Sequence, residues 1–320
     1  MSSSSASSTE VVVTPAAGDG EAALGESTGG GGEKGGGLIT TAWAAPGMLW
    51  LGFFLIAPLV FIVLVSLWTY QQGAKSGFVT EWTLENYRDL FGDAAYWTNM
   101  WKSFLTSLIS VAACLVFGFP VAYYLTFKIQ SLKAQIGLFI LALAPFWTSF
   151  LTRSIAWTYP LMGRQGALNQ VLEKLGIIDE PVDAFGFSQL SVTLAMIQLY
   201  ILFMVTPLFF MLGQVDRSAI EAARDLGGNW FKTFKEVIVP QSMPGVVIGS
   251  IFIFVLTMGE YGTVRVIGGN TIPSVGTIVQ SKVEIALNYP QGAAAAVLLV
   301  AALVLGVFVI TRFSNLREDV

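Results

Sequence analysis

Six long apolar segments constrain this chain more than any other feature of its sequence. They lie near Ala45–Tyr70, Ser103–Phe127, Ile136–Leu151, Val192–Leu212, Val246–Val266 and Ala293–Phe313. Most of them approach or exceed the ~20 residues that an α-helix needs to cross the hydrocarbon core of a bilayer. Because no water bonds exposed backbone groups there, each segment is expected to be helical. The sequence therefore predicts an all-α polytopic membrane protein with six transmembrane helices.

Composition agrees with a membrane protein and argues against several other functions. Charged residues make up only 12% of the chain, against about 25% in a soluble domain. The net charge of −4 offers no basic patch for nucleic acid. One cysteine, Cys114, and no histidine leave no basis for a disulfide, a metal site or Ser-His-Asp catalysis. No phosphate-binding Gly-x-x-x-x-Gly-Lys-Ser/Thr motif is present, so we expect neither an enzyme nor a bound cofactor.

The first forty residues differ from the rest of the chain. Residues 1–40 are runs of Ser, Gly, Ala and Glu, which bury too little apolar surface to offset the entropy of ordering. They are expected to form a disordered cytoplasmic tail, which leaves residues 41–320 as the transmembrane domain.

Orientation follows from the density of basic residues. With both termini inside, the inner side holds eight of them, four in the loop between the fourth and fifth segments: Lys128, Lys133, Arg217, Arg224, Lys232, Lys235, Arg312 and Arg317. The outer loops hold a similar number spread over roughly twice as many residues. Dense basic residues favour the inner side, so both termini are expected to be cytoplasmic.

That same loop, residues 214–245, carries a spaced motif. Its residues are Glu221, Ala222, Ala223, Gly227, Val237, Val239 and Pro240. Asp216 is a good N-cap for a helix beginning at Arg217, and Gly227 suits a left-handed helix end. Asn229 is expected to cap a second short helix that ends before Pro240. The loop is therefore predicted to form a rigid helix–Gly–helix knob, and the plain alternative is an ordinary helical hairpin.

The spacing of this motif resembles the cytoplasmic signature loop of the membrane subunits of bacterial ABC importers. Matching segments elsewhere are Leu84–Tyr87, Gly118–Tyr124, Pro145–Ser149, Gly259–Tyr261 and Asn288–Ala294. Over about residues 45–315, the chain resembles the spermidine/putrescine permease family. That resemblance implies a type I importer fold in a bacterial inner membrane. It also implies a second homologous permease, an ABC ATPase dimer that hydrolyses ATP, and an external substrate-binding protein, with the motif loop as the ATPase-coupling loop.

One departure from the family pattern leaves the substrate open. The family's Gly-acidic-aromatic segment is usually followed by a run that contains proline, whereas here Gly262–Arg265 follows. This variant is similar to the sulfate/molybdate permeases. A polyamine is therefore the first expectation, and an amino-acid derivative, an opine-like compound or an oxyanion such as sulfate is the alternative.

Glu260 is the only acidic residue that lies well inside a predicted span. A carboxylate in a bilayer is costly unless it faces water, a cation or a partner, and carboxylates with aromatic faces suit a polycation. The candidate substrate pathway is Glu260, Tyr261, Tyr123 and Trp147. The alternatives are that Glu260 forms an ion pair with Arg153 or Arg265, and that the aromatic residues only pack in the core or face lipid.

A transporter that works without an ATPase is the alternative from another class. Such a protein is expected to show an inverted repeat and several ionisable residues within its spans. The sequence shows no inverted repeat, and Glu260 is its one good candidate for an ionisable residue within a span.

The second outer loop has apolar residues at helical spacing before Gly176, namely Leu168, Val171, Leu172 and Leu175. This spacing predicts a short amphipathic helix, which either docks a partner or caps the bundle.

Overall fold

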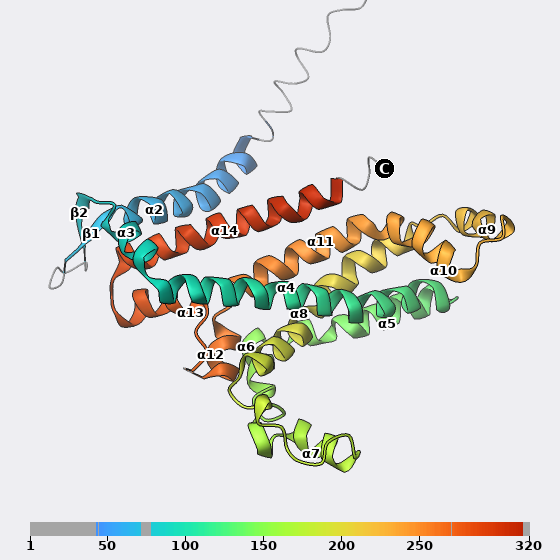
Figure 1. Cartoon of the computed structure of the whole chain (residues 1–320). Helices are drawn as coiled ribbons and strands as arrows, with labels where there is room; N and C mark the ends of the chain where they lie inside the picture. Colours follow the sequence, from blue (N-terminus) through green and yellow to red (C-terminus); the bar gives the residue numbers. More distant parts are fainter. Residues whose placement is uncertain (1–42, 44, 72–77, 270, 316–320) are drawn as a thin grey trace, which may run out of the picture. The chain divides into compact units, whose positions relative to one another are not determined.

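The computed structural model describes residues 43, 45–71, 78–269 and 271–315 (Figure 1). The predicted tail, residues 1–40, lies outside the described residues. The chain divides into two compact units, residues 1–56 and 57–320. In the first unit, residues 45–51 are helical and lead into the π-helical turn η1 (Gly52–Ile56). All the remaining elements belong to the second unit.

The second unit is almost entirely helical, with one small sheet. Its first half contains α2 (Ala57–Ser66), β1 (Trp68–Tyr70), β2 (Phe78–Trp82), α3 (Glu85–Gly92), α4 (Ala94–Tyr123), η2 (Tyr124–Lys128), α5 (Leu132–Leu143), η3 (Ala144–Trp147), α6 (Phe150–Ala156), η4 (Gly163–Gln165), α7 (Ala167–Lys174) and η5 (Asp183–Phe185). Its second half contains α8 (Gln189–Gly213), α9 (Arg217–Asp225), α10 (Trp230–Thr233), η6 (Phe234–Ile238), α11 (Val239–Met258), α12 (Gly262–Gly268), α13 (Val275–Gln280), η7 (Ser281–Ile285) and α14 (Tyr289–Asn315).

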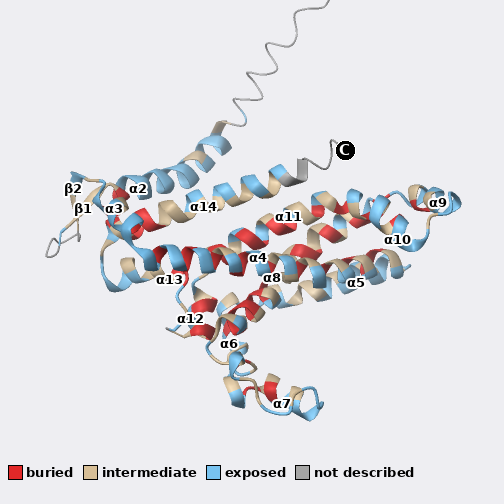
Figure 2. Ribbon diagram, viewed as in Figure 1, coloured by how far each residue is buried: buried red, intermediate tan, exposed pale blue. Residues whose placement is uncertain are grey.

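Helices α4, α8 and α11 pack against one another, and α14 lies against α2 and α11. Figure 2 shows that the buried residues concentrate along α4, α8 and α11. Glycines allow this close packing. A Cβ added to Gly249 of α11 would lie 2.7 Å from the Met204 Sδ of α8, and one at Gly118 of α4 would lie 3.3 Å from the Met204 Cγ. Met204 therefore fills the space that both glycines leave open.

Within the part of the chain that the structure describes, five helical stretches are long and apolar enough to cross a membrane. They are Ala45–Ser66, Ala94–Lys128, Gln189–Gly213, Trp230–Met258 and Tyr289–Arg312. The predicted third span is a bent pair, Leu132–Trp147 and Phe150–Ala156, with an angle of 89° at the break. Pro145 lies in the 3₁₀ turn at that break, and Thr148 after it is extended. Because proline lacks an amide hydrogen, it removes a helical hydrogen bond at this point, which favours a break without requiring one. The count of six spans holds if the bent pair is one span.

The predicted fifth span, Val246–Val266, is wrong at its C-terminal end. Helix α11 ends at Met258, and a separate short helix, α12, begins at Gly262. The side chain of Glu260 accepts a hydrogen bond from the backbone N–H of Thr263 at 2.8 Å. A carboxylate at this position satisfies an amide in the first turn of α12, which stabilises the start of a new helix rather than the continuation of the old one.

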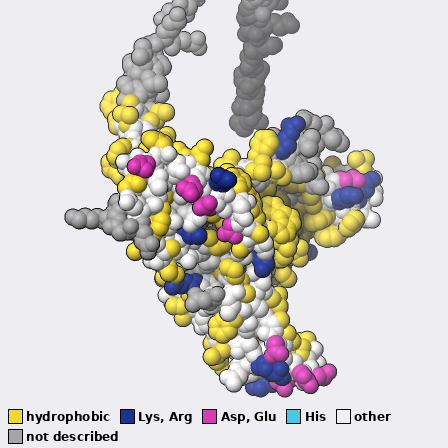
Figure 3. Space-filling view, turned by 60° about the vertical axis from the view of Figure 1, so that its left-hand side comes forward, with side chains coloured by type: hydrophobic (Ala, Val, Ile, Leu, Met, Phe, Trp, Pro, Cys, Tyr) yellow, Lys and Arg dark blue, Asp and Glu magenta, His cyan; other side chains and the backbone are white. Residues whose placement is uncertain are grey.

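Two smaller features lie at the loops between spans. Strands β1 and β2 form an antiparallel hairpin that pairs Tyr70 with Phe78, a feature the sequence did not predict. Helix α7 confirms the predicted amphipathic helix, and Gly176 follows it with a φ of 68°. Figure 3 shows charged side chains gathered at the tip where α7 lies, whereas the body above carries broad hydrophobic areas. Such apolar areas are expected where spans face lipid or another membrane subunit.

Candidate functional site

The first helix of the motif loop has the predicted ends. The Asp216 carboxylate accepts hydrogen bonds from the Ser218 N–H at 2.9 Å and from the Ser218 hydroxyl at 2.7 Å. These bonds from Ser218 lower the pKa of the Asp216 carboxyl. At the other end, Gly227 has a φ of 81°, and the Gly228 N–H donates to the Ala223 carbonyl at 2.9 Å. Both predicted caps of α9 are therefore confirmed.

The second helix begins as predicted but does not end where predicted. The Asn229 side chain accepts a hydrogen bond from the Lys232 N–H at 2.8 Å, which confirms the cap. The predicted end before Pro240 is wrong, because Trp230–Met258 is one helical stretch of 29 residues. In the π-turn η6, the Val239 N–H bonds back to the Phe234 carbonyl. Pro240 follows in the first turn of α11, where a missing amide hydrogen is tolerated.

The motif residues divide between an outward and an inward side of the loop. Glu221, Ala222 and Pro240 are exposed, whereas Ala223, Val237 and Val239 are half-buried. Ile220 and Ile238 are buried and anchor the loop on the bundle. Beyond Ala223 the loop exposes large apolar side chains, with Leu226 at 89% exposure, Phe231 at 65% and Trp230 at 57%. Exposed apolar side chains gathered on one loop are typical of a surface that binds a partner.

Glu260 lies at the break between α11 and α12, where it joins three elements. The Tyr200 hydroxyl of α8 donates to Glu260 Oε2 at 2.5 Å. The backbone N–H of Thr263 donates to Oε1, and the Ser274 hydroxyl donates to the Glu260 carbonyl at 3.0 Å. The carboxylate is half-buried. Its position is therefore set by hydrogen bonds from α8 and α12, and its backbone carbonyl is bonded from the cap of α13.

The alternative for Glu260, an ion pair with Arg153 or Arg265, is not present within 4.0 Å among the described residues. Arg265 Nη1 lies 4.0 Å from Glu284 Oε2 instead. The Arg153 guanidinium stacks over the Phe146 ring at 4.8 Å, and its buried Nε has no hydrogen-bond partner in the described structure. Tyr200 stacks on Phe150 with ring centroids 6.1 Å apart. The surroundings of Glu260 thus combine aromatic rings from α6 and α8.

The four predicted pathway residues do not form a single cluster. Tyr261 adjoins Glu260 and is 49% exposed, and Trp147 is 84% exposed at the break between α5 and α6. Tyr123 lies near the other end of α11, where it packs against Phe234 with ring centroids 6.2 Å apart. The 20 residues of α11 make a helix of about 30 Å between these ends. Tyr123 therefore belongs to the loop end of the bundle.

Sequence reasoning missed Tyr200 and Phe150 as neighbours of Glu260. Tyr200 is 60 residues away in the chain, and nothing in its local sequence distinguishes it from the other aromatic residues of α8. The hydroxyl of a buried tyrosine usually finds a hydrogen-bond partner, which is the one general signal available. Only the packing of α8 against α11 identifies that partner as Glu260.

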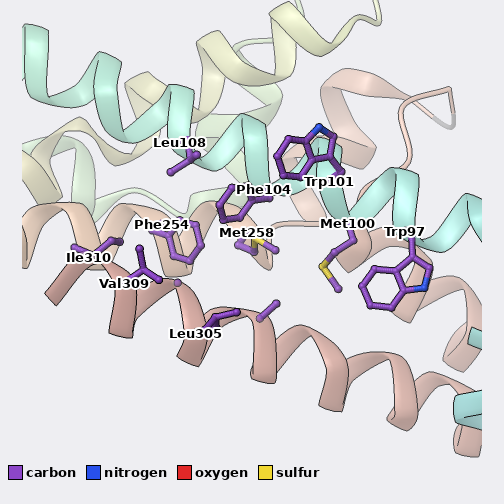
Figure 4. A pocket seen from close by; sticks show the side chains of 12 residues that line it. Trp97, Met100, Trp101, Phe104, Leu108, Phe254, Met258, Leu305, Val309 and Ile310 are labelled. Atoms are coloured by element: carbon purple, nitrogen blue, oxygen red, sulfur yellow. The ribbon is translucent and has the colours of Figure 1, made fainter. Parts of the chain in front are cut away.

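An apolar recess of about 330 Å³ lies between α4, α11 and α14 (Figure 4). Its lining is Trp97, Met100, Trp101, Phe104, Leu108, Phe254, Met258, Ala302, Leu305, Gly306, Val309 and Ile310. These side chains carry no ionisable group, and their only nitrogen atoms are those of the two indoles. A charged solute has no partner there, so this recess is a poor site for a polar substrate.

Solved structures share the fold at low sequence identity. A chain of the bacterial ABC transporter involved in the import of the acidic polysaccharide alginate superposes with a TM-score of 0.60 at 14% identity, over 87% of this chain and 95% of that chain. A chain of the methionine ABC transporter MetNI in an inward-facing conformation gives a TM-score of 0.50 at 18% identity, over 68% and 94%. The fold is that of a membrane subunit of an ABC importer.

Curated proteins of similar sequence define the family. The spermidine/putrescine transport system permease protein PotB of Haemophilus influenzae is 32% identical over 267 residues, which is 83% of this chain and 91% of the relative. PotB of Escherichia coli is also 32% identical, over 83% and 94%. The inner membrane ABC transporter permease protein YdcU of Escherichia coli is 28% identical over 77% and 80%. No family model matches the chain. The chain belongs to the spermidine/putrescine permease family of ABC importers.

Proposed function

We propose that this chain is the permease subunit of an ATP-driven importer for polyamines such as spermidine and putrescine. The observation that carries the proposal is the 32% identity with PotB of Haemophilus influenzae over 83% of the chain. The helix–Gly–helix loop supports it, because Glu221, Ala222 and Gly227 stand exposed on a capped knob. A polyamine also matches a half-buried carboxylate that is surrounded by aromatic rings.

The proposed machine has four kinds of partner. An ABC ATPase dimer binds the exposed face of α9 and hydrolyses ATP, a second homologous permease completes the pathway, and an external substrate-binding protein delivers the solute. The fourth partner is lipid, because α14 exposes Val304, Leu305 and Phe308. In this arrangement the chain crosses a bacterial inner membrane with both termini in the cytoplasm.

Coupling is proposed to run along one helix. Helix α9 packs on α10 and η6, and α10 continues into α11 without a break. The Trp230–Met258 stretch of 29 residues spans about 40 Å. Its far end is two residues from Glu260. When the ATPase dimer closes and moves α9, this helix is expected to transmit the movement as a rigid body to the break that holds Glu260.

The proposed substrate pathway runs past Glu260, Tyr261 and Trp147, and Tyr123 lies at its cytoplasmic end. Glu260 supplies a fixed negative charge for one ammonium group. The half-exposed ring of Tyr261 and the exposed ring of Trp147 offer faces for the methylene chain and for a second ammonium group. Glu260 accepts hydrogen bonds from Tyr200 and Thr263, and no described cation is paired with it within 4.0 Å. An ammonium group can therefore bind this carboxylate without displacing an existing ion pair.

A second candidate substrate is a small oxyanion that also carries an amine. One observation favours it: the buried Arg153 Nε has no partner in the described structure, and Tyr200 joins this region to Glu260. A cation and an anion on neighbouring elements would suit a zwitterion. The putative 2-aminoethylphosphonate transport system permease protein PhnU of Salmonella typhimurium is 26% identical over 85% of this chain.

One experiment separates these substrates. The chain is co-expressed with the products of its neighbouring genes, purified as a complex and placed in nanodiscs. ATPase activity is then measured with the binding protein loaded in turn with spermidine, putrescine, 2-aminoethylphosphonate, sulfate and a panel of amino acids. Stimulation by polyamines alone is expected. Stimulation by another ligand alone would reject the polyamine, and a complex without ATPase activity would reject the coupling role of α9.

A further inference from the structure

A recess of about 210 Å³ lies between α9, the end of α4 with η2, and the short elements α10 and η6. It is distinct from the surroundings of Glu260, which lie at the other end of α11. Its lining is Tyr123, Phe127, Lys128, Arg217, Ile220, Glu221, Arg224, Trp230, Thr233 and Ile238. The side of α9 that faces the bundle therefore encloses a space instead of packing closely over its whole length.

The charges around this recess are unbalanced. Three cationic side chains line it, Lys128, Arg217 and Arg224, against one carboxylate, that of Glu221. Arg217 and Arg224 are seven residues apart, so they lie two turns apart on the same face of α9. The two ion pairs within 4.0 Å among the described residues are Arg164–Asp183 and Arg265–Glu284. No described carboxylate therefore neutralises these cations at close range.

A buried polar group in the lining also lacks a partner. Thr233 is only 3% exposed, and its hydroxyl has no hydrogen-bond partner in the described structure. An unsatisfied buried hydroxyl is destabilising unless water or a ligand bonds it. The hydroxyl, the two guanidinium groups and the Lys128 ammonium group supply several donors to the lining, against the single carboxylate of Glu221. This excess of donors indicates a site for an anion with several oxygen atoms.

We propose that this recess binds a phosphate-type oxyanion, through Arg217, Arg224 and Lys128, with Thr233 as a neutral donor. A guanidinium group can donate two parallel hydrogen bonds to a phosphate. A phosphate has more oxygen atoms than a carboxylate, so it can accept such bonds from both arginines at once. The rings of Tyr123, Phe127 and Trp230 form the rest of the wall. A phosphate there would join α9 to the end of α4 and would hold the loop against the bundle.

The place of the recess in the fold suggests where the phosphate comes from. It lies at the loop ends of the candidate spans Ala94–Lys128 and Trp230–Met258, which face the cytoplasm in the proposed orientation. Basic pockets between helices on the cytoplasmic side bind anionic headgroups, and tyrosine and tryptophan, both present in the lining, are favoured near such headgroups. A soluble phosphate offers the same oxygen atoms, so lipid and free phosphate must be compared directly. That the bound anion regulates transport rests on the proposed function, whereas the binding itself does not.

Binding is tested on the purified full-length chain by native mass spectrometry. The chain in detergent is titrated with phosphatidylglycerol, with phosphatidylcholine and with inorganic phosphate. The test variant is Arg217→Gln with Arg224→Gln. The matched control is Lys232→Gln with Lys235→Gln, which removes the same charge from the same loop but outside the recess. Loss of two charge-assisted bonds is expected to weaken binding by on the order of a hundredfold, and the control is expected to change it less than threefold.

The outcomes of the binding experiment either identify the source of the anion or reject the site. Selective binding of phosphatidylglycerol that only the test variant loses would assign the site to a lipid headgroup. Saturable binding of inorganic phosphate that only the test variant loses would assign it to a soluble phosphate. Equal losses in the test and control variants, or no binding of either anion, would overturn the proposal. Thr233→Val keeps the charge and is expected to weaken binding on the order of tenfold, with its thermal unfolding temperature recorded to verify folding.

Regulation is tested separately in nanodiscs with the assembled importer. Polyamine-stimulated ATPase activity is expected to fall severalfold when phosphatidylcholine replaces phosphatidylglycerol, and the Arg217→Gln, Arg224→Gln variant is expected to lose this lipid dependence. If polyamines do not stimulate ATPase activity in any sample while anion binding persists, the polyamine substrate is rejected and the anion site is retained. If stimulation is normal and equally lipid-dependent in the variant, the regulatory claim falls.

Discussion

The Tyr200 hydroxyl donates a hydrogen bond of 2.5 Å to Glu260, and this bond joins the centre of α8 to the break between α11 and α12. The same carboxylate bonds the first turn of α12 through the Thr263 N–H. The Glu260 side chain therefore bonds the first turn of α12 and also joins this turn to α8. A movement of α11 relative to α8 has to stretch or reorient this bond.

Removal of the hydroxyl by Tyr200→Phe is expected to lower the free energy of unfolding by about 1.5–3 kcal/mol. The reason is that the variant removes a hydrogen bond to a charged group and leaves a half-buried carboxylate oxygen without its donor. Thermal unfolding of the purified chain in detergent measures the effect. Tyr261→Phe is the control, because Tyr261 is half exposed. An unchanged unfolding temperature for Tyr200→Phe would show that the bond contributes nothing.

Neutralisation of the carboxylate by Glu260→Gln is expected to reduce uptake of spermidine at limiting concentration by at least tenfold. The amide keeps the size of the side chain but removes the negative charge that attracts an ammonium group, and one pairing of this kind is worth about 1.4 kcal/mol or more. Proteoliposome uptake with radiolabelled spermidine measures the change. Glu284→Gln, at an exposed carboxylate, is the control. Normal uptake in Glu260→Gln would leave Glu260 with a structural role only.

Changes at the exposed residues Glu221 and Gly227 of the loop are expected to abolish transport without preventing insertion. Glu221→Lys reverses an exposed charge on α9, and Gly227→Pro places a residue with φ near −65° where the chain has a φ of 81°. Uptake and ATPase coupling are measured beside the amount of protein in the membrane fraction. Glu236→Lys, another exposed carboxylate of the same region, is the control. Full uptake in both loop variants would contradict the coupling role.

Crowding at the contact between α8 and α11 is expected to destabilise the bundle. In Gly249→Leu, the first added carbon would lie 2.7 Å from the Met204 Sδ and 3.0 Å from the Met204 Cα. Overpacking of this kind costs about 1–3 kcal/mol, because a backbone atom cannot move aside as a side chain can. Gly137→Leu in α5 is the matched control, because nothing lies within 4 Å of its added carbon. Thermal unfolding compares the two, and equal stability would contradict the packing.

Local sequence rules predicted most, but not all, of the helix ends in the motif loop. The caps at Asp216, Gly227 and Asn229 were all predicted, because each depends on one residue type and on backbone groups close to it in the chain. The end before Pro240 was not, because the rule for proline assumes an ordinary α-helix. A π-turn before the proline changes the hydrogen-bond register, and Pro240 falls in the first turn of α11, where a missing amide hydrogen is tolerated.

The recess between α9 and α4 could not be predicted in the same way. Its basic residues were visible in the sequence as charges on the inner side of the membrane. Lys128 and Arg224 are nearly a hundred residues apart, and only the return of α11 beside α4 brings them to one cavity. Sequence patterns report which residues share a helix face, but they carry no information on which two helices meet.

The sequence by itself determined that this chain spans a membrane, that its motif loop is a capped knob and that it resembles polyamine permeases. These properties depend on the hydropathy of contiguous residues and on hydrogen bonds between close neighbours. Only the tertiary structure decided that the third span bends at Pro145, that α10 continues into α11, and that Glu260 lies at a break and bonds Tyr200. Those outcomes depend on hydrogen bonds and packing between helices that are distant in the chain, and the balance among them is decided when the helices assemble.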